Sequence, residues 1–219
     1  MPRKSMFVLI LIMFIGCSLF TGCSKYRYVL VPPAVDLISH GNIGLISFST
    51  ENAEGELNEI ATQRFLQIVT QSQRGVQLIE LGNLDEIMKK IGKTRLDQET
   101  VKAIGQYFNV TAVFSGKINI SDVKPQVSLD TLIKSLGVSA TFNITLTSRF
   151  YSTETGATLW TNSVYRKDSL GSMSLSEGGI PSFNVKDEEE TYKILIQDMI
   201  YLMTRDFRQT EQRVKVKKY

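Results

Sequence analysis

Histidine and cysteine, which supply many metal ligands and catalytic groups, are nearly absent from this sequence. Its 219 residues include one histidine, His40, and two cysteines, Cys17 and Cys23. A zinc site needs several such ligands, and a nucleophilic centre needs a base close to its nucleophile. We therefore expect no catalytic residue, no metal site and no bound cofactor, and we expect the protein not to be an enzyme. A hydrolase that uses a pair of carboxylates is the least favoured alternative.

A large excess of charge of one sign is also missing. The formal net charge is +3, and Arg3 and Lys4 near the start contribute to it. Because the rest of the chain is close to neutral, there is no electrostatic reason to expect nucleic-acid binding. Both cysteines lie within the first 23 residues, so the remainder can form no disulfide. Its stability must come from a hydrophobic core, which a domain of this size can provide.

The first 23 residues have the layout of a secretory signal. Two cations precede an apolar run at residues 6–15, and small residues ending in Gly22 come directly before Cys23. This order predicts a signal peptide over residues 1–22 that is cleaved after Gly22. A cysteine at this place resembles the signal of bacterial lipoproteins, which implies that Cys23 is acylated, with palmitate among its acyl groups. Ser24 after that cysteine implies the outer membrane, with the protein on its periplasmic face.

The same segment has three alternative interpretations, none of which fits as well as lipidation at Cys23. A transmembrane helix needs about 20 apolar residues, and the small and polar residues at 16–22 interrupt the run. An ordinary cleaved signal would leave a free thiol at Cys23. Acylation at Cys17 would shorten the apolar run too far. We therefore expect attachment to the membrane through a lipidated Cys23.

The rest of the chain divides into three parts. Residues 23–41 have no helical or strand periodicity, contain a proline pair, and predict a tether in which His40 is solvated. Residues 42–209 predict a single domain. The basic residues of 210–219 predict a solvated tail, although its lysines could also contact anionic lipid or peptidoglycan.

Hydrophobic periodicity predicts most of the elements of the domain. The expected strands cover residues 43–48, 76–80 and 110–121, and the expected helices cover 54–73, 84–91, 97–108 and 187–207. Asn83 and Asp97 are suited to cap the second and third helices. The acidic run at 187–190 favours the start of the last helix over a metal site, because carboxylates complement the positive end of a helix dipole.

A strong two-residue alternation follows Gly137. Apolar residues alternate with polar, mostly hydroxyl-bearing ones over 138–150, a turn is expected at 153–156, and a second strand at 158–165. The expected fold is α/β: a single mixed sheet with a long antiparallel hairpin, covered by helices on at least one face. We expect residues 127–136 to favour a short helical segment over a strand, and residues 168–186 to form a flexible loop.

Several segments carry a resemblance to a known superfamily. Residues 42–48 resemble the opening strand of the curli-secretion (CsgG-like) lipoproteins and their peptidoglycan-synthase-activator (LpoB-like) relatives. Residues 84–91 followed by 104–116 resemble their helix-then-strand signature, with a glycine in the helix and another at the end of the strand. Residues 151–160 are similar to their hairpin turn. The resemblance spans about residues 42–166 and includes no catalytic residue.

This resemblance implies one of two functions. An accessory or assembly lipoprotein would bind an envelope protein, and Trp160 and Tyr165 on the second hairpin strand are the candidate partner-binding residues, with core packing the favoured role of Trp160. A ring-shaped outer-membrane secretion channel, a homo-oligomer, would insert residues 120–138 and 166–186 as crossing strands. Such strands need about 9 to 11 residues of sustained alternation. Because neither segment shows it clearly, the accessory function is preferred.

Overall fold

The computed structural model describes residues 26–51, 56–121, 124–130, 135–175, 181–185 and 187–215. Over 124–130, 135–140, 170–175, 181–185 and 188–189 it describes the backbone alone. Contacts divide the chain into two units, one made of residues 33–208 and the other of residues 1–32 with 209–219. Each unit is considered by itself below. The signal peptide and Cys23 lie outside the described residues.

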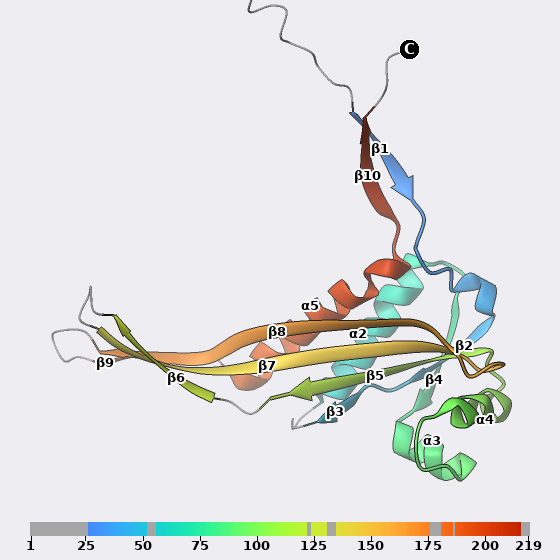
Figure 1. Ribbon diagram of the computed structural model, residues 1–219, viewed down its shortest axis with the longest axis horizontal. Coiled ribbons are helices and arrows are strands. Elements are labelled where there is room, and N and C mark those ends of the chain that lie inside the picture. The colour runs from blue at the N-terminus through green and yellow to red at the C-terminus, as the bar shows by residue number, and fades with distance from the viewer. Residues whose placement is uncertain are drawn as a thin grey trace, which may run out of the picture. The chain divides into compact units, whose positions relative to one another are not determined.

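The larger unit is built on one mixed sheet. Its strands are β2 (Asn42–Ile46), β3 (Ser49–Glu51), β4 (Gln77–Gly82), β5 (Ala112–Ile120), β6 (Lys124–Asp130), β7 (Ser135–Ser152), β8 (Thr158–Leu175) and β9 (Pro181–Val185). Among the described residues the sheet has eight strands in the order β4-β2-β5-β7-β8-β9, with β3 also pairing with β5 and β6 with β7. Pairing is parallel among β2, β3, β4 and β5, and antiparallel from β5 onward (Figure 1).

Helices flank this sheet, and most begin where the sequence predicts. They are η1 (Ile38–His40), α2 (Leu57–Ser72), α3 (Leu84–Ile91), α4 (Gln98–Phe108), α5 (Glu188–Met203) and η2 (Thr204–Phe207). Asn83, Asp97 and Asp187 are the N-caps of α3, α4 and α5, and the side chain of each accepts a hydrogen bond from a backbone N–H three residues later. These bonds satisfy donors that a helix start leaves unpaired.

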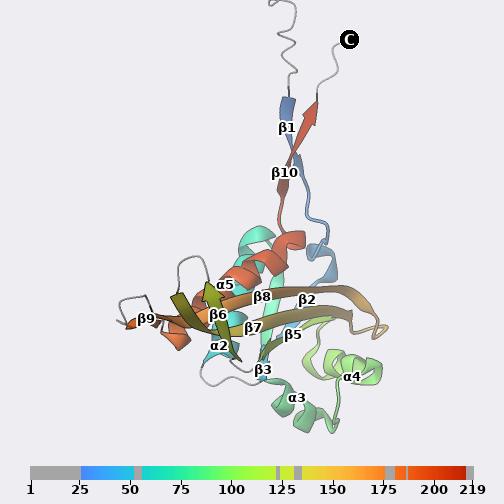
Figure 2. The same ribbon diagram turned by 60° about the vertical axis from the view of Figure 1, so that its left-hand side comes forward.

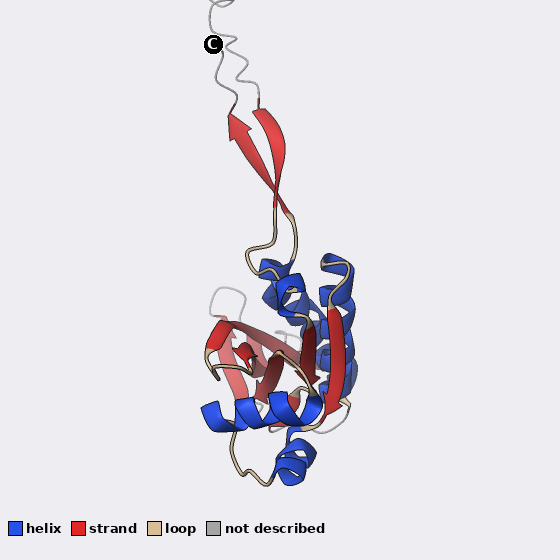
Figure 3. Ribbon diagram, turned by 90° about the vertical axis from the view of Figure 1, so that its right-hand side faces the viewer, coloured by secondary structure: helices blue, strands red, loops and turns tan. Residues whose placement is uncertain are grey.

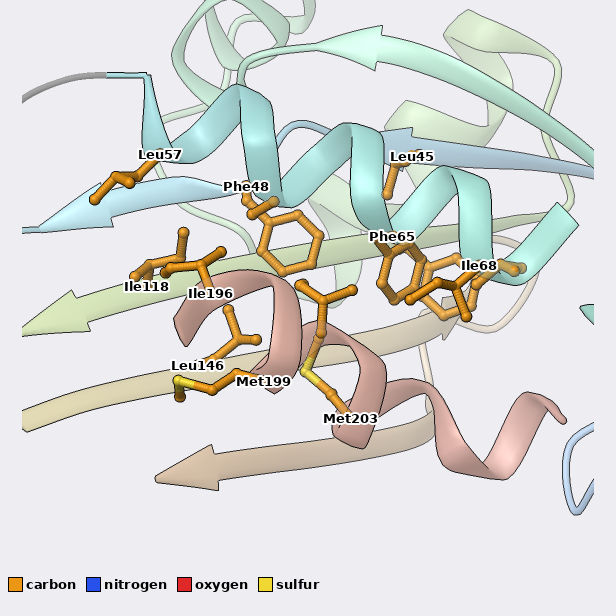
Figure 4. Packing of buried hydrophobic residues seen from close by; sticks show 14 of the residues in the cluster. Leu45, Phe48, Leu57, Phe65, Ile68, Ile118, Leu146, Ile196, Met199 and Met203 are labelled. Atoms are coloured by element: carbon orange, nitrogen blue, oxygen red, sulfur yellow. The ribbon is translucent and has the colours of Figure 1, made fainter. Parts of the chain in front are cut away.

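The two faces of the sheet are covered by different helices. On one face α2 and α5 pack over the strands, with Phe48, Phe65 and Met203 at the centre of the larger hydrophobic core (Figure 4). On the other face α3 and α4 form a smaller core with Ile46 and Val113. Figure 1 shows α4 close to the turn that joins β7 to β8, where Gln98 Nε2 donates a hydrogen bond to the carbonyl oxygen of Thr155. The predicted fold class, a mixed α/β sheet with a long antiparallel hairpin and covering helices, is confirmed.

The smaller unit is a two-stranded antiparallel ribbon. Strand β1 (Tyr26–Val31) pairs with β10 (Thr210–Lys215), from Tyr26 opposite Lys215 to Val31 opposite Thr210 (Figure 3). The irregular conformation expected for residues 23–41 is therefore wrong over Tyr26–Val31, and the tail expected at 210–219 is a strand over Thr210–Lys215, where every residue is exposed as expected. The pairing was missed because each strand is short and its partner is distant in the sequence.

Two predicted segments near the open end of the hairpin are also wrong. The helical segment expected at 127–136 is strand over Lys124–Asp130 and again from Ser135, and the loop expected at 168–186 is strand over much of its length. Backbone pairing explains both, because β6 pairs with β7 and β9 with β8, so four strands lie side by side at this end of the sheet (Figure 2). The ladder satisfies the backbone groups that a short helix would have left partly unpaired.

Candidate protein-docking site

The helices leave part of one sheet face uncovered. α3 and α4 cover only the end of this face, where Val113 and Tyr151 lie. Beyond them the same face carries half-buried or exposed residues from three neighbouring strands, which we call the open face. Its members are Ser115 and Lys117 on β5, Asn143, Thr145, Thr147 and Arg149 on β7, and Thr161, Ser163, Tyr165 and Lys167 on β8.

The register of the sheet arranges the open face in rows. Arg149 lies opposite Thr161, Thr147 opposite Ser163, and Thr145 opposite Tyr165. Residues that are directly opposite in an antiparallel pair share a face, so these side chains form one surface. Hydroxyl groups dominate it, and they offer both donors and acceptors to a partner.

Tyr165 is the aromatic residue of the open face. Its side chain is 56% exposed. The phenol Oη donates a hydrogen bond to Asn143 Oδ1 at 2.7 Å, and Thr147 Oγ1 lies 3.1 Å from Ser163 Oγ nearby. The first bond holds the ring in place across the strands and leaves the ring available to a partner. A positioned aromatic ring is typical of protein-binding surfaces.

One ion pair fixes the edge of the open face. Lys117 Nζ lies 2.6 Å from Glu51 Oε1, and Asn119 Nδ2 donates to Glu51 Oε2 at 3.0 Å. The hydrogen bond from Lys117, followed by that from Asn119, lowers the pKa of the Glu51 carboxyl, so this group stays ionised. Arg149 and Lys167 are exposed cations on this surface, and their charges suit acidic side chains of a partner.

Trp160, the other candidate partner-binding residue, lies on the covered side of the same strand. It is 9% exposed, and its ring centroid lies 4.7 Å from that of Phe207. The indole Nε1 donates a hydrogen bond to Asp206 Oδ2 at 2.9 Å. The structure therefore places Trp160 in the core with its polar group satisfied, and does not bring it together with Tyr165.

The remaining sequence-predicted groups lie elsewhere. Gly22 and Cys23 are outside the described residues. His40, expected in a solvated tether, is half-buried in η1, and its ring contacts the edge of Phe150 at a centroid distance of 5.1 Å. Among the described residues no group of three or more His, Cys, Asp or Glu side chains gathers where a metal could bind. No helix in the described part of the chain is both long and apolar enough to cross a membrane.

Sequence reasoning missed Arg149 and Lys167 as parts of a site. The alternation over residues 138–150 already separated an apolar face from a hydroxyl-rich one, and Arg149 belongs to the second. The sequence does not show that, among the described helices, none covers the face beyond α3 and α4.

Comparisons with known proteins describe what this chain is similar to. No protein-family model matches the chain, and no curated protein matches it. Among solved structures it is similar to the PelC dodecamer from Paraburkholderia phytofirmans, with 9% identity, a TM-score of 0.43, and coverage of 83% of this chain and 97% of PelC. It is similar to lipoprotein GNA1162 from Neisseria meningitidis, with 12% identity, a TM-score of 0.41, and coverage of 75% and 98%. It is also similar to the LpoB C-terminal domain from Salmonella enterica, with 10% identity, a TM-score of 0.36, and coverage of 62% and 84%.

Proposed function

We propose that this protein is a lipoprotein of the bacterial outer membrane that acts in the periplasm as a non-enzymatic accessory or assembly factor. A lipidated Cys23 would hold it at the membrane, and the open face around Tyr165 would bind an envelope protein. The observation that carries this proposal is the uncovered sheet face, which presents a positioned tyrosine among hydroxyl groups and two exposed cations.

The physical support for docking lies in the composition of the open face. Tyrosine and arginine are the residue types that most often dominate binding energy in protein interfaces, and the open face has one of each, Tyr165 and Arg149. The surrounding Thr and Ser side chains are short, so little conformational entropy is lost when a partner covers them. A polar, non-obligate interface of this kind suits a transient complex with the partner.

Support for the proposed localisation comes from the sequence alone. The signal layout that ends at Gly22 and Cys23 is that of an exported protein. Several acyl chains on one cysteine would make the attachment stable, because a single chain gives only marginal membrane binding.

Site-specific photo-crosslinking in intact cells tests the docking proposal. A photoreactive residue in place of Ser163, beside Tyr165 on the open face, should give an adduct of one defined mass. The same residue at Gln71, exposed on α2, is the matched control and should not give that adduct. Tyr165→Ala should abolish the Ser163 adduct, whereas Tyr107→Ala on α4 should leave it. Adducts of equal yield at both positions, or an adduct that survives Tyr165→Ala, would contradict the proposal.

A ring-shaped secretion subunit is the second candidate, and one observation favours it. Over their described residues the two segments form paired strands, and one row across β6, β7, β8 and β9 carries apolar residue types: Val127 lies opposite Val138, Val138 opposite Met173, and Met173 opposite Phe183. Against it, β6 has 7 residues and β9 has 5, fewer than the roughly 9 to 11 that a crossing strand needs. The mass of the full-length lipoprotein in mild detergent decides between the two. A stable monomer or dimer supports the accessory function, and a large ring supports the channel.

A further inference from the structure

The ribbon of β1 and β10 has one face that combines tyrosines with cations. Tyr26 lies opposite Lys215 and Tyr28 opposite Arg213, so these four residues share a face, which we call the ribbon face. The guanidinium carbon of Arg213 lies 3.9 Å from the centre of the Tyr26 ring, a cation–π contact between diagonal neighbours. Tyr28 is 68% exposed and Tyr26 is 44% exposed.

A ribbon of this kind gains little stability from its own contacts. Every residue of β10 is exposed, and on β1 only Val29 and Val31 are half-buried. Two-stranded ribbons are marginal in water, because they bury too little apolar surface to offset the entropy lost on ordering. The ribbon face therefore has surface and charge available for a further contact.

The chain itself limits where the ribbon face can lie. Only Ser24 and Lys25 separate Cys23 from Tyr26. Three residue steps reach at most about 11 Å, and the headgroup layer of one leaflet is about 5 to 8 Å deep. A lipidated Cys23 would thus keep Tyr26 within the headgroups or just outside them. Tyrosine is enriched at that level in membrane proteins, because its ring is apolar and its hydroxyl is polar.

The charge of the ribbon fits an anionic surface. Its described residues include the cations Arg213 and Lys215 on the ribbon face, with the anion Glu211 on the same side, and the cation Arg27 on the opposite side. In the sequence Lys25 precedes the ribbon and two further lysines follow it, at positions 217 and 218. Clusters of about four to eight basic residues beside a membrane anchor bind anionic headgroups.

We propose that the ribbon face is a membrane-contact surface that binds the anionic phospholipid headgroups of the leaflet holding the anchor. This inference rests on the proposed function, because it assumes that Cys23 is the anchor. The acyl chains would supply most of the attachment, and the ribbon face would hold the chain beside the anchor flat against the headgroups.

Vesicle sedimentation of the mature chain carrying Cys23→Ala tests the contact without the acyl chains. The chain should bind vesicles of phosphatidylethanolamine with phosphatidylglycerol, and should not bind vesicles of phosphatidylcholine alone. Arg213→Ser with Lys215→Ser should lower the partition coefficient about 25-fold, since each basic residue near such a surface contributes about fivefold. Lys89→Ser with Lys90→Ser, which removes the same charge from exposed positions on α3, should leave binding within about twofold of wild type.

A second pair of variants tests the contribution of the tyrosines to vesicle binding. Tyr28→Ser should weaken vesicle binding, whereas Tyr107→Ser, at an exposed tyrosine on α4, should not. Equal binding by the ribbon-face variants and their controls would overturn the proposal. So would a dimer, seen without vesicles, that Arg213→Ser with Lys215→Ser dissociates, because the ribbon face would then bind a second copy of the chain.

The two proposals fail in different ways. If Cys23 is not the anchor, labelled palmitate will not be incorporated at Cys23 in cells, while vesicle binding by the unacylated chain will be unchanged. If the ribbon face does not bind lipid, the label will be incorporated and the vesicle experiment will fail.

Discussion

At the scale of single residues, two glycines occupy places where a methyl group has no room. A Cβ on Gly105 would lie 2.3 Å from the Cβ of Thr153, and one on Gly116 would lie 2.1 Å from Phe48 Cε1. Gly105 therefore lets α4 approach the hairpin turn, and Gly116 lets the Phe48 ring lie on β5. Gly105 lies within α4 and Gly116 in the middle of β5, so both positions need the absence of a side chain for packing.

We predict that Gly105→Ala destabilises the protein by about 1 to 3 kcal/mol, the usual cost of overpacking a tight contact. The better helix propensity of alanine offsets part of this, about 1 kcal/mol at most. Gln106→Ala, at the next and exposed position of α4, is the control and should change stability by about 0.5 kcal/mol or less. Urea unfolding followed by circular dichroism measures both, and equal stability of the two variants would show that Thr153 can move aside.

At the scale of elements, Gln73 joins three segments that are distant in the sequence. Its side-chain Oε1 accepts a hydrogen bond from the backbone N–H of Leu37 at 2.8 Å. Its Nε2 donates to the carbonyl oxygens of Val35 at 2.6 Å and Phe207 at 3.1 Å. The residue is buried just past the end of α2, so it fastens both the segment before η1 and the end of η2 to that helix.

We predict that Gln73→Leu destabilises the protein by about 3 kcal/mol, because it leaves a buried donor and two carbonyls without their partner. Gln71→Leu changes the same side chain at an exposed position of α2 and should have little effect. Hydrogen exchange adds a second measurement, since the amide of Leu37 should lose protection in Gln73→Leu alone. Retained protection at Leu37 would mean that another group replaces the glutamine.

The N-cap of α4 makes one prediction about acid. The backbone N–H of Thr100 donates to the Asp97 carboxylate, and with Arg95 and the Thr100 hydroxyl it lowers the pKa of Asp97 below its ordinary value of 3.8. A carboxyl whose pKa is lower in the folded state stabilises that state above its unfolded pKa, and this contribution is lost as the pH falls through the folded pKa. The stability gap between wild type and Asp97→Ala should thus be constant near neutral pH and shrink below about pH 3.8.

Thermal unfolding midpoints measured across that range check this expectation. Asn83→Ala removes the corresponding cap of α3, which carries no ionisable group, so its gap should change much less. A gap for Asp97→Ala that stays constant in acid would show that the carboxylate is not what stabilises the helix start.

The sequence predicts an element well when the interactions that form it join residues close together in the chain. Caps at Asn83 and Asp97 and the apolar stripe of α5 are local patterns, and they were predicted well. The helical spacing seen at 127–136 is local too, yet the backbone ladder between β6 and β7 determines the structure there. Pairing of β1 with β10 depends on residues far apart in the chain, which no local pattern reveals. Of the candidate site, the sequence predicts Tyr165 but not the open face, because that face depends on where the covering helices end.

At the scale of the whole molecule, the proposed anchor makes a direct prediction. Cys23→Ala should release the processed protein from membranes into the periplasm, since the ribbon face alone would contribute only weak, salt-sensitive binding. Fractionation of cells followed by detection of the protein measures this, and Cys17→Ala is the matched control, which should leave the protein in the membrane fraction. A processed Cys23→Ala protein that stays membrane-bound at high salt would contradict lipid anchoring.

The two ends of the larger unit are brought together by the unit itself. The backbone N–H of Val35 donates to the carbonyl oxygen of Asp206 at 3.2 Å, and Gln73 spans the same two segments. In an unfolded chain, joining β1 to β10 would mean closing a loop of all the residues between them, with a large loss of chain entropy. Once the larger unit has folded, that loss has already occurred, and the ribbon closes over a gap of a few residues. Ribbon formation is thus conditional on a correctly folded domain, and in a misfolded chain the cations and the tyrosines of the proposed ribbon face would stay on two separate segments.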